Sequence, residues 1–109
     1  MFFCAAAHEV THQLTGNALG TLRYFQLPRW VREGYADYVG KGPSFDYAAA
    51  RSAFLAGVPE MDPKMSGLYW RFHLLVAYLL DHRHWSLQEV LDHPPAQAEV
   101  ERAVREERP

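Results

Sequence analysis

The sequence has a single cysteine, no long apolar run and no strong excess of either charge. One cysteine, Cys4, excludes an intramolecular disulfide. The longest apolar run, residues 74–80, is far shorter than the roughly 20 residues that span a bilayer, so no membrane span is expected. The apolar start, residues 1–7, lacks the basic flank and cleavage site of a signal peptide. Localisation stays undetermined, with the cytoplasm as the default.

Charge gives no reason to expect a nucleic-acid partner. The net charge is -2, the pI is near 6.3, and the basic residues are scattered along the chain. An electropositive patch would be needed to hold phosphates. We therefore expect no nucleic acid and no anionic membrane as partners.

The composition and periodicity predict a single, mainly α domain over residues 1–109. With 109 residues and 49% hydrophobic residues, the chain can bury one core. Five or six helices are expected, with residues 1–92 as the core and 96–109 as a weakly docked terminal helix. The predicted helices span residues 2–15, 28 to about 40–42, 44–56, 66–82, a short stretch that begins at 86 and stops before 94–95, and 96–108.

Local signals refine these helices. Ser44 is expected to cap the third, with Phe45, Ala49, Ser52, Ala53 and Ala56 as its core stripe. The fourth is apolar on several sides, which is typical of a central core helix. A capping box, Ser86 to Glu89, is expected to open the fifth. The connection over residues 17–27 is expected to be an ordered loop packed on the core.

The motif H-E-x-x-H occupies residues 8–12. On a helix His8 and His12 lie on one face, about 6 Å apart along the axis, so both imidazoles can reach one zinc ion. Glu9 then sits beside the metal, where its carboxylate can take a proton from zinc-bound water. The alternative is a helix wall with two ordinary histidines. Cys4 lies about 12 Å from His12 along the axis and is read as a small buried residue rather than a ligand.

A second segment supplies what a catalytic zinc site still needs. Such a site takes three protein ligands and keeps one position open. The natural third ligand is Glu33, with twenty residues between it and His12. Asp37 follows one turn later, placed to accept a hydrogen bond from a ligating histidine, His8 above all. Gly34 costs about 1 kcal/mol in a helix interior, and it would let two helices approach closely.

These two motifs, H-E-V-T-H and W-V-R-E-G-Y-A at residues 30–36, together resemble the gluzincin clan of zinc metallopeptidases. The W-x-x-E-G-x-A form is closest to the aminopeptidase and "peptidase MA-like" branch. The resemblance is strong over residues 5–40 and traceable to about residue 92. It implies one zinc per chain held by His8, His12 and Glu33, with Glu9 as general base and Asp37 as an orienting carboxylate. A peptide or protein substrate is implied in the same way.

The family also implies a hydroxyl donor. A tyrosine near the start of a downstream helix often donates a hydrogen bond to the oxyanion in this family, and Tyr69 lies 36 residues after Glu33. Its alternative is a core tyrosine with a satisfied hydroxyl. His73, one turn on, could serve instead or be polar packing. His82, His84 and His93 show no metal-ligand spacing.

One family feature is missing from this chain. In gluzincins the motif helix follows a β-sheet whose edge strand holds the substrate backbone, and no such sheet precedes residue 8 here. A partner chain or an upstream domain could supply it. The sequence thus leaves three readings: an active zinc peptidase, a zinc-stabilised but inactive binding module, and a metal-free helical interaction module. It does not decide between exopeptidase and endopeptidase.

Overall fold

The computed structural model describes residues 24, 26–42, 45–62 and 69–107. Within these ranges the regular structure is helical and contains no strand. The mainly α fold predicted from the sequence is confirmed. The helical elements are α3 (Arg29–Lys41), α4 (Tyr47–Ala56), a short 3-10 helix (Pro59–Met61), α6 (Trp70–Ala77), a π-helical turn (Tyr78–His82), α7 (Leu87–Asp92) and α8 (Gln97–Glu106).

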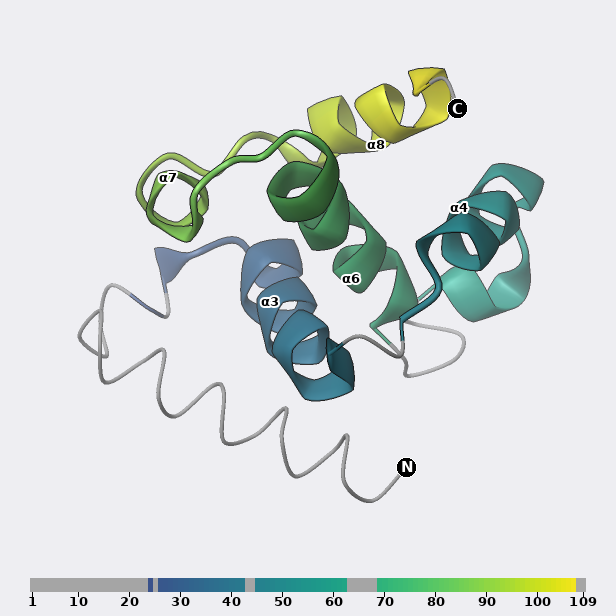
Figure 1. Cartoon of the computed structure of the whole chain (residues 1–109), viewed down its shortest axis with the longest axis horizontal. Coiled ribbons are helices and arrows are strands. Elements are labelled where there is room, and N and C mark those ends of the chain that lie inside the picture. Colours follow the sequence, from purple (N-terminus) through teal and green to yellow (C-terminus); the bar gives the residue numbers. More distant parts are fainter. Residues whose placement is uncertain (1–23, 25, 43–44, 63–68, 108–109) are drawn as a thin grey trace.

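Helix α6 is the centre of the core, as its apolar pattern predicts. Residues 72–79 are all buried, and α3, α4 and α8 pack against α6 (Figure 1). A helix surrounded on several sides needs apolar side chains on all of them, which the sequence provides. The helix starts later than predicted, because Tyr69 has a non-helical backbone and stands before the first turn. Residues 66–68 lie outside the described part of the chain.

Helix α3 has the predicted bounds. Pro28 precedes it, and Gly42 follows it with a positive φ of 55°. A proline at the start of a helix gives up no intrahelical hydrogen bond, since the first backbone N–H groups of a helix have no partner within it. Ahead of α3, Tyr24 and Leu27 are buried in the core, in agreement with the predicted packing of this connection.

Helix α4 corrects two predictions. It begins at Tyr47, where the Asp46 carboxylate caps it by accepting a hydrogen bond from Ala49 N at 3.0 Å; the predicted cap, Ser44, is outside the described residues. The predicted core stripe is partly wrong, since Phe45 and Ala53 pack against the core but Ala56 is exposed. Ala50 and Phe54 are buried, whereas Ala49 and Ser52 are exposed. Most apolar residues of this helix are alanines, and of its large apolar side chains Phe54 packs inward while Leu55 is 49% exposed.

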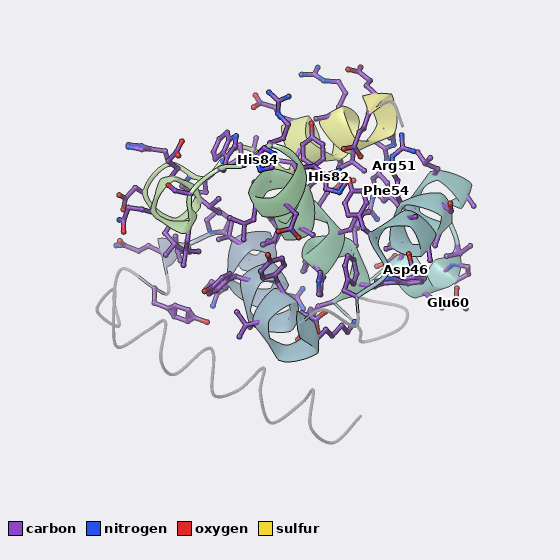
Figure 2. The ribbon with its side chains drawn as sticks, viewed as in Figure 1. Asp46, Arg51, Phe54, Glu60, His82 and His84 are labelled. Carbon is purple, nitrogen blue, oxygen red and sulfur yellow. The ribbon has the colours of Figure 1, made fainter. Side chains whose placement is uncertain are left out.

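The two C-terminal helices differ in how well the sequence predicts them. The capping box of α7 is present, with Ser86 and Glu89 bonded reciprocally. Helix α8, expected to dock weakly, is instead firmly packed: Val104 is fully buried, and Arg51 of α4 donates hydrogen bonds to the carbonyls of Val104 and Glu107. Figure 2 shows Arg51 on the side of α4 that faces the end of α8. Residues 97–106 therefore belong to the same core.

No helix in the described ranges is both long enough and apolar enough to cross a membrane.

Candidate active site

Glu33 and Asp37 lie one turn apart on α3. Trp30, Val31 and Ala36 are the buried side chains of this helix, and their packing fixes which way the polar side chains of α3 face. Both carboxylates are partly exposed, and both approach the start of α6. The helical spacing that the sequence predicted for this pair is therefore present.

Gly34 brings α3 and α6 into close contact. A Cβ atom built on Gly34 would lie 2.5 Å from the carbonyl oxygen of Phe72 and 2.7 Å from Cγ2 of Val76. Only glycine leaves room for the α6 backbone at this distance. The close approach predicted at Gly34 is thus found, and its direct effect is to bring the side chains beside it within hydrogen-bonding range of α6.

Tyr69 is hydrogen-bonded to Glu33. Burial raises the pKa of the Tyr69 phenol, and the hydrogen bond to the Glu33 carboxylate raises it further, while Arg29 acts in the opposite direction. A phenol with a raised pKa stays protonated at neutral pH and remains a donor. Two predicted site residues that are 36 positions apart in the sequence therefore meet.

Asp37 meets His73 one turn further along each helix. Asp37 Oδ2 lies 2.8 Å from His73 Nδ1 and 3.1 Å from Lys41 Nζ. The His73 ring is 1% exposed and stacks on Phe45 with 3.6 Å between ring centroids. Burial lowers the pKa of His73, although the Asp37 carboxylate acts the other way. A neutral imidazole with its Nδ1–H donated to Asp37 fits these surroundings.

The contact between Asp37 and His73 was not among the predictions. The sequence offered one signal for it: Tyr69 and His73 have the same four-residue spacing as Glu33 and Asp37. Side chains with that spacing lie on one face of a helix, so two such pairs on packed helices can match. The sequence alone predicts for His73 only a role as the oxyanion donor in place of Tyr69, or polar packing.

Outside the described part of the chain lie three predicted site residues: His8, Glu9 and His12. Cys4 lies outside it as well, and so does the helix predicted over residues 2–15, which carries all four. Within residues 24, 26–42, 45–62 and 69–107, no three His, Cys, Asp or Glu side chains gather in a way that could hold a metal ion. Of the predicted site residues, the structure describes Glu33, Asp37 and Tyr69.

The pockets of the described surface include one beside the candidate site and one at the C-terminal end. The first, called the aromatic pocket below, is formed by Tyr38, Gly42, Phe45, Tyr47, His73 and Asp81, and has a volume of about 370 Å³. It shares His73 with the Asp37 contact, so it adjoins the candidate site.

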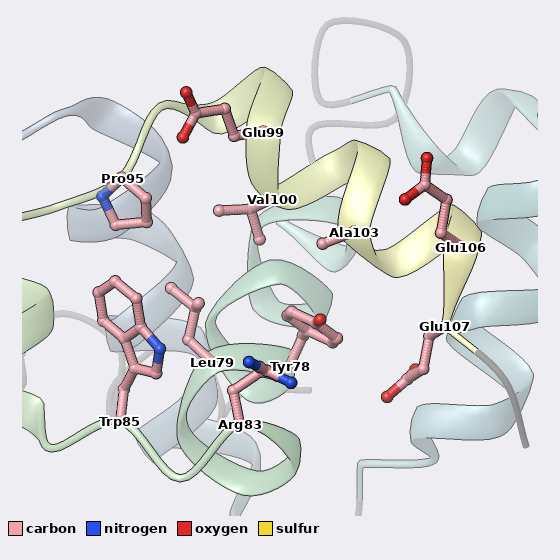
Figure 3. A pocket seen from close by; sticks show the side chains of 10 residues that line it. All are labelled: Tyr78, Leu79, Arg83, Trp85, Pro95, Glu99, Val100, Ala103, Glu106 and Glu107. Atoms are coloured by element: carbon pink, nitrogen blue, oxygen red, sulfur yellow. The ribbon is translucent and has the colours of Figure 1, made fainter.

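The second, called the C-terminal pocket, has a volume of about 450 Å³ and lies between α8 and the chain that follows α6 (Figure 3). Trp85, Arg83 and Val100 are among its lining residues, and Glu33, Asp37, Tyr69 and His73 are not.

Comparison with known proteins gives no match: no family description, no curated protein and no solved structure is similar to this chain at a significant level.

Proposed function

We propose that this protein is a zinc-dependent peptidase with a gluzincin-type site. The observation that carries the proposal is the hydrogen bond between Tyr69 and Glu33. The family resemblance implies that both residues belong to one site, and they lie together although nothing in their local sequence requires it. The packing of α3 on α6 at Gly34 explains how they meet.

The donor set fits zinc. Two imidazoles and one carboxylate are a common ligand set of catalytic zinc, with one position left for water or substrate. His8, His12 and Glu33 would hold the ion. The Glu33 carboxylate is partly exposed and hydrogen-bonded by Tyr69, as ligating carboxylates in metal sites usually are.

Bound zinc would supply a Lewis acid that polarises the peptide carbonyl and makes water more acidic. The remaining chemistry belongs to the chain. Glu9 accepts the proton of the attacking water and passes it to the departing amine. Tyr69, protonated at neutral pH, has a hydroxyl to donate, either to the developing oxyanion or to Glu33. Asp37, held by His73, orients a ligating histidine.

Zinc content and peptide hydrolysis, measured on matched variants, test this proposal. The wild-type chain and Glu9→Gln should each hold close to one zinc, because Glu9 is not a ligand, while His8→Ala and Glu33→Gln should lose it. Hydrolysis of a peptide library should disappear in all three variants. Equal zinc retention in His8→Ala and Glu9→Gln contradicts the ligand assignment. Zinc binding without any hydrolysis by the wild type supports the inactive binding module instead.

A further inference from the structure

The aromatic pocket combines three aromatic rings with one carboxylate. Tyr38 comes from α3, Tyr47 from α4 and Phe45 from the segment just before α4, while Asp81 comes from the π-helical turn after α6. Elements far apart in the sequence thus build one concave site. Its volume of about 370 Å³ is within the range of about 300–1,000 Å³ that is typical of small-molecule sites.

The walls of this pocket are held in place by ring stacking and hydrogen bonds, some of which join two lining residues. Phe45 stacks on His73, and Tyr47 stacks on His82 at 3.8 Å between ring centroids. The Tyr38 hydroxyl donates to Asp81 Oδ1 at 2.7 Å, and the Tyr47 hydroxyl donates to Glu107 Oε1 at 2.7 Å. Rings that are already ordered lose little entropy when a ligand enters, so the pocket is preorganised.

The charge of the lining favours a cation. Asp81 is the only charged residue among the six, and its exposed carboxylate stands at the pocket. His73 is buried with a lowered pKa, and Tyr38 has a pKa raised to about 12 by burial and by its hydrogen bond to Asp81, so both are neutral at pH 7. The nearest lysine on α3, Lys41, is paired with Asp37. Aromatic faces and a carboxylate together attract an ammonium or guanidinium group.

We propose that the aromatic pocket binds the lysine or arginine side chain of a peptide. The choice of a peptide as the ligand rests on the proposed function. If the protein is a peptidase, this pocket helps to determine which substrates it cleaves. Tyr38 lies five residues beyond Glu33, which is about 7.5 Å along the helix axis. An extended peptide advances about 3.3 Å per residue, so the bound side chain would be about two residues from the cleaved bond.

The C-terminal pocket is the natural competitor for a cation, because Glu99, Glu106 and Glu107 line it. It already contains a cation, Arg83 (Figure 3). Its Glu107 carboxylate accepts from the Tyr47 hydroxyl and pairs with His82 at 2.7 Å. The aromatic pocket has no Lys or Arg among its described lining residues, and this difference in charge favours it.

The test compares two probes, one with a side-chain ammonium group and one without it. Nα-acetyl-lysine methylamide and the matching norleucine compound are titrated calorimetrically into the Glu9→Gln chain, in which turnover is blocked. The lysine probe should bind about tenfold more tightly than the norleucine probe. Asp81→Asn should remove this preference and leave norleucine binding unchanged, because an asparagine oxygen can still accept from Tyr38. Phe45→Leu should reduce the preference several-fold through loss of one ring face.

Glu99→Gln, in the C-terminal pocket, is the matched control and should keep the full preference. No preference for the lysine probe overturns the proposal, and so does a preference that Glu99→Gln removes and Asp81→Asn retains. Thermal unfolding of Asp81→Asn verifies that the variant folds. If the lysine preference depends on Asp81 but the wild type hydrolyses no peptide, the proposed cation site is supported and the proposed peptidase function is refuted. Hydrolysis without preference for basic residues refutes the pocket alone.

Discussion

Asp37 Oδ2 lies 2.8 Å from Nδ1 of His73, and this contact joins the polar side of α3 to the fully buried side of α6. A buried imidazole needs a partner for its N–H, and Asp37 provides one. The same contact holds Asp37 in one orientation, one turn beyond Glu33. His73 is therefore a positioning residue for the candidate site as well as a core residue.

Stability should fall in mild acid because of His73. Burial lowers its pKa below the ordinary 6.5, so the unfolded chain takes up a proton that the folded chain resists. The unfolded state then binds more protons below about pH 6.5, and the free energy of unfolding decreases as pH falls through that window. One group contributes at most about 1.4 kcal/mol per pH unit. Urea unfolding at a series of pH values measures the slope.

His73→Phe keeps the ring that stacks on Phe45 and removes the titrating group. This variant should be less stable at neutral pH, by about 1–3 kcal/mol, since Asp37 loses its hydrogen bond with the imidazole. Its stability should depend less on pH than that of the wild type. His93→Gln, at an exposed histidine, is the control and should keep the wild-type slope. Identical slopes in wild type and His73→Phe would rule out His73 as the source.

Gly34→Ala should destabilise the fold although alanine is the better helix former. Helix propensity alone predicts a gain of about 1 kcal/mol. The new methyl group, however, would lie 2.5 Å from the Phe72 carbonyl oxygen, and backbone atoms cannot rotate away. Overpacking of this kind costs about 1–3 kcal/mol or more, so a net loss is expected. Zinc binding should weaken with it, because Glu33 is the adjacent residue.

Gly57→Ala is the comparison for this variant. Gly57 closes α4 with a φ of 68° and has open space where a Cβ would stand. The left-handed backbone alone makes this substitution cost about 1–2 kcal/mol, and zinc affinity should be unchanged. Equal zinc affinities in Gly34→Ala and Gly57→Ala would mean that the approach of α3 to α6 does not shape the site.

Tyr69→Phe separates two roles for the phenol. If the hydroxyl mainly holds Glu33, zinc affinity should fall by about tenfold or more, which is typical of residues that bond to a metal ligand. If it mainly serves the oxyanion, kcat should fall by a factor of about 10²–10³ with zinc affinity unchanged. The hydrogen bond to Glu33 favours the first result. Competition with a fluorescent zinc chelator gives the affinity, and peptide turnover gives kcat.

The sequence predicts where the helices of this fold begin and end better than it predicts which face of each helix is buried. Proline and glycine fix the bounds of α3, and the capping box fixes the start of α7, because these signals act within a few residues. The buried face of α4 could not be predicted, since alanine packs almost as well on either side and the partners of Phe54 are distant in the sequence. Arg71 of α6 and Arg105 of α8 lie over its ring.

For the candidate site, too, the sequence predicts some features and not others. Motif spacing predicts that Glu33 and Asp37 share one helix face, and this is found. Which α6 residue each one meets depends on how the helices pack, so the contact between Asp37 and His73 is visible only in three dimensions. The assignment of His8, Glu9 and His12 stays a prediction, because these residues lie outside the described ranges.

The attachment of α8 should depend on Arg51. Its guanidinium donates to the carbonyls of Val104, Arg105 and Glu107 at the C-terminal end of α8, where the last backbone carbonyls of a helix have few intrahelical donors. Arg51→Met keeps the apolar stem and removes these donors. We expect a loss of about 1–3 kcal/mol, because charged donors are lost from partly buried acceptors.

Amide hydrogen exchange locates this effect. In Arg51→Met the last turn of α8 should exchange faster, while the amides of α3 should keep their wild-type protection. Arg102→Met, at an exposed arginine of the same helix, is the control and should change neither stability nor exchange appreciably. Faster exchange spread evenly over the whole chain would mean that Arg51 supports the fold globally rather than the end of α8.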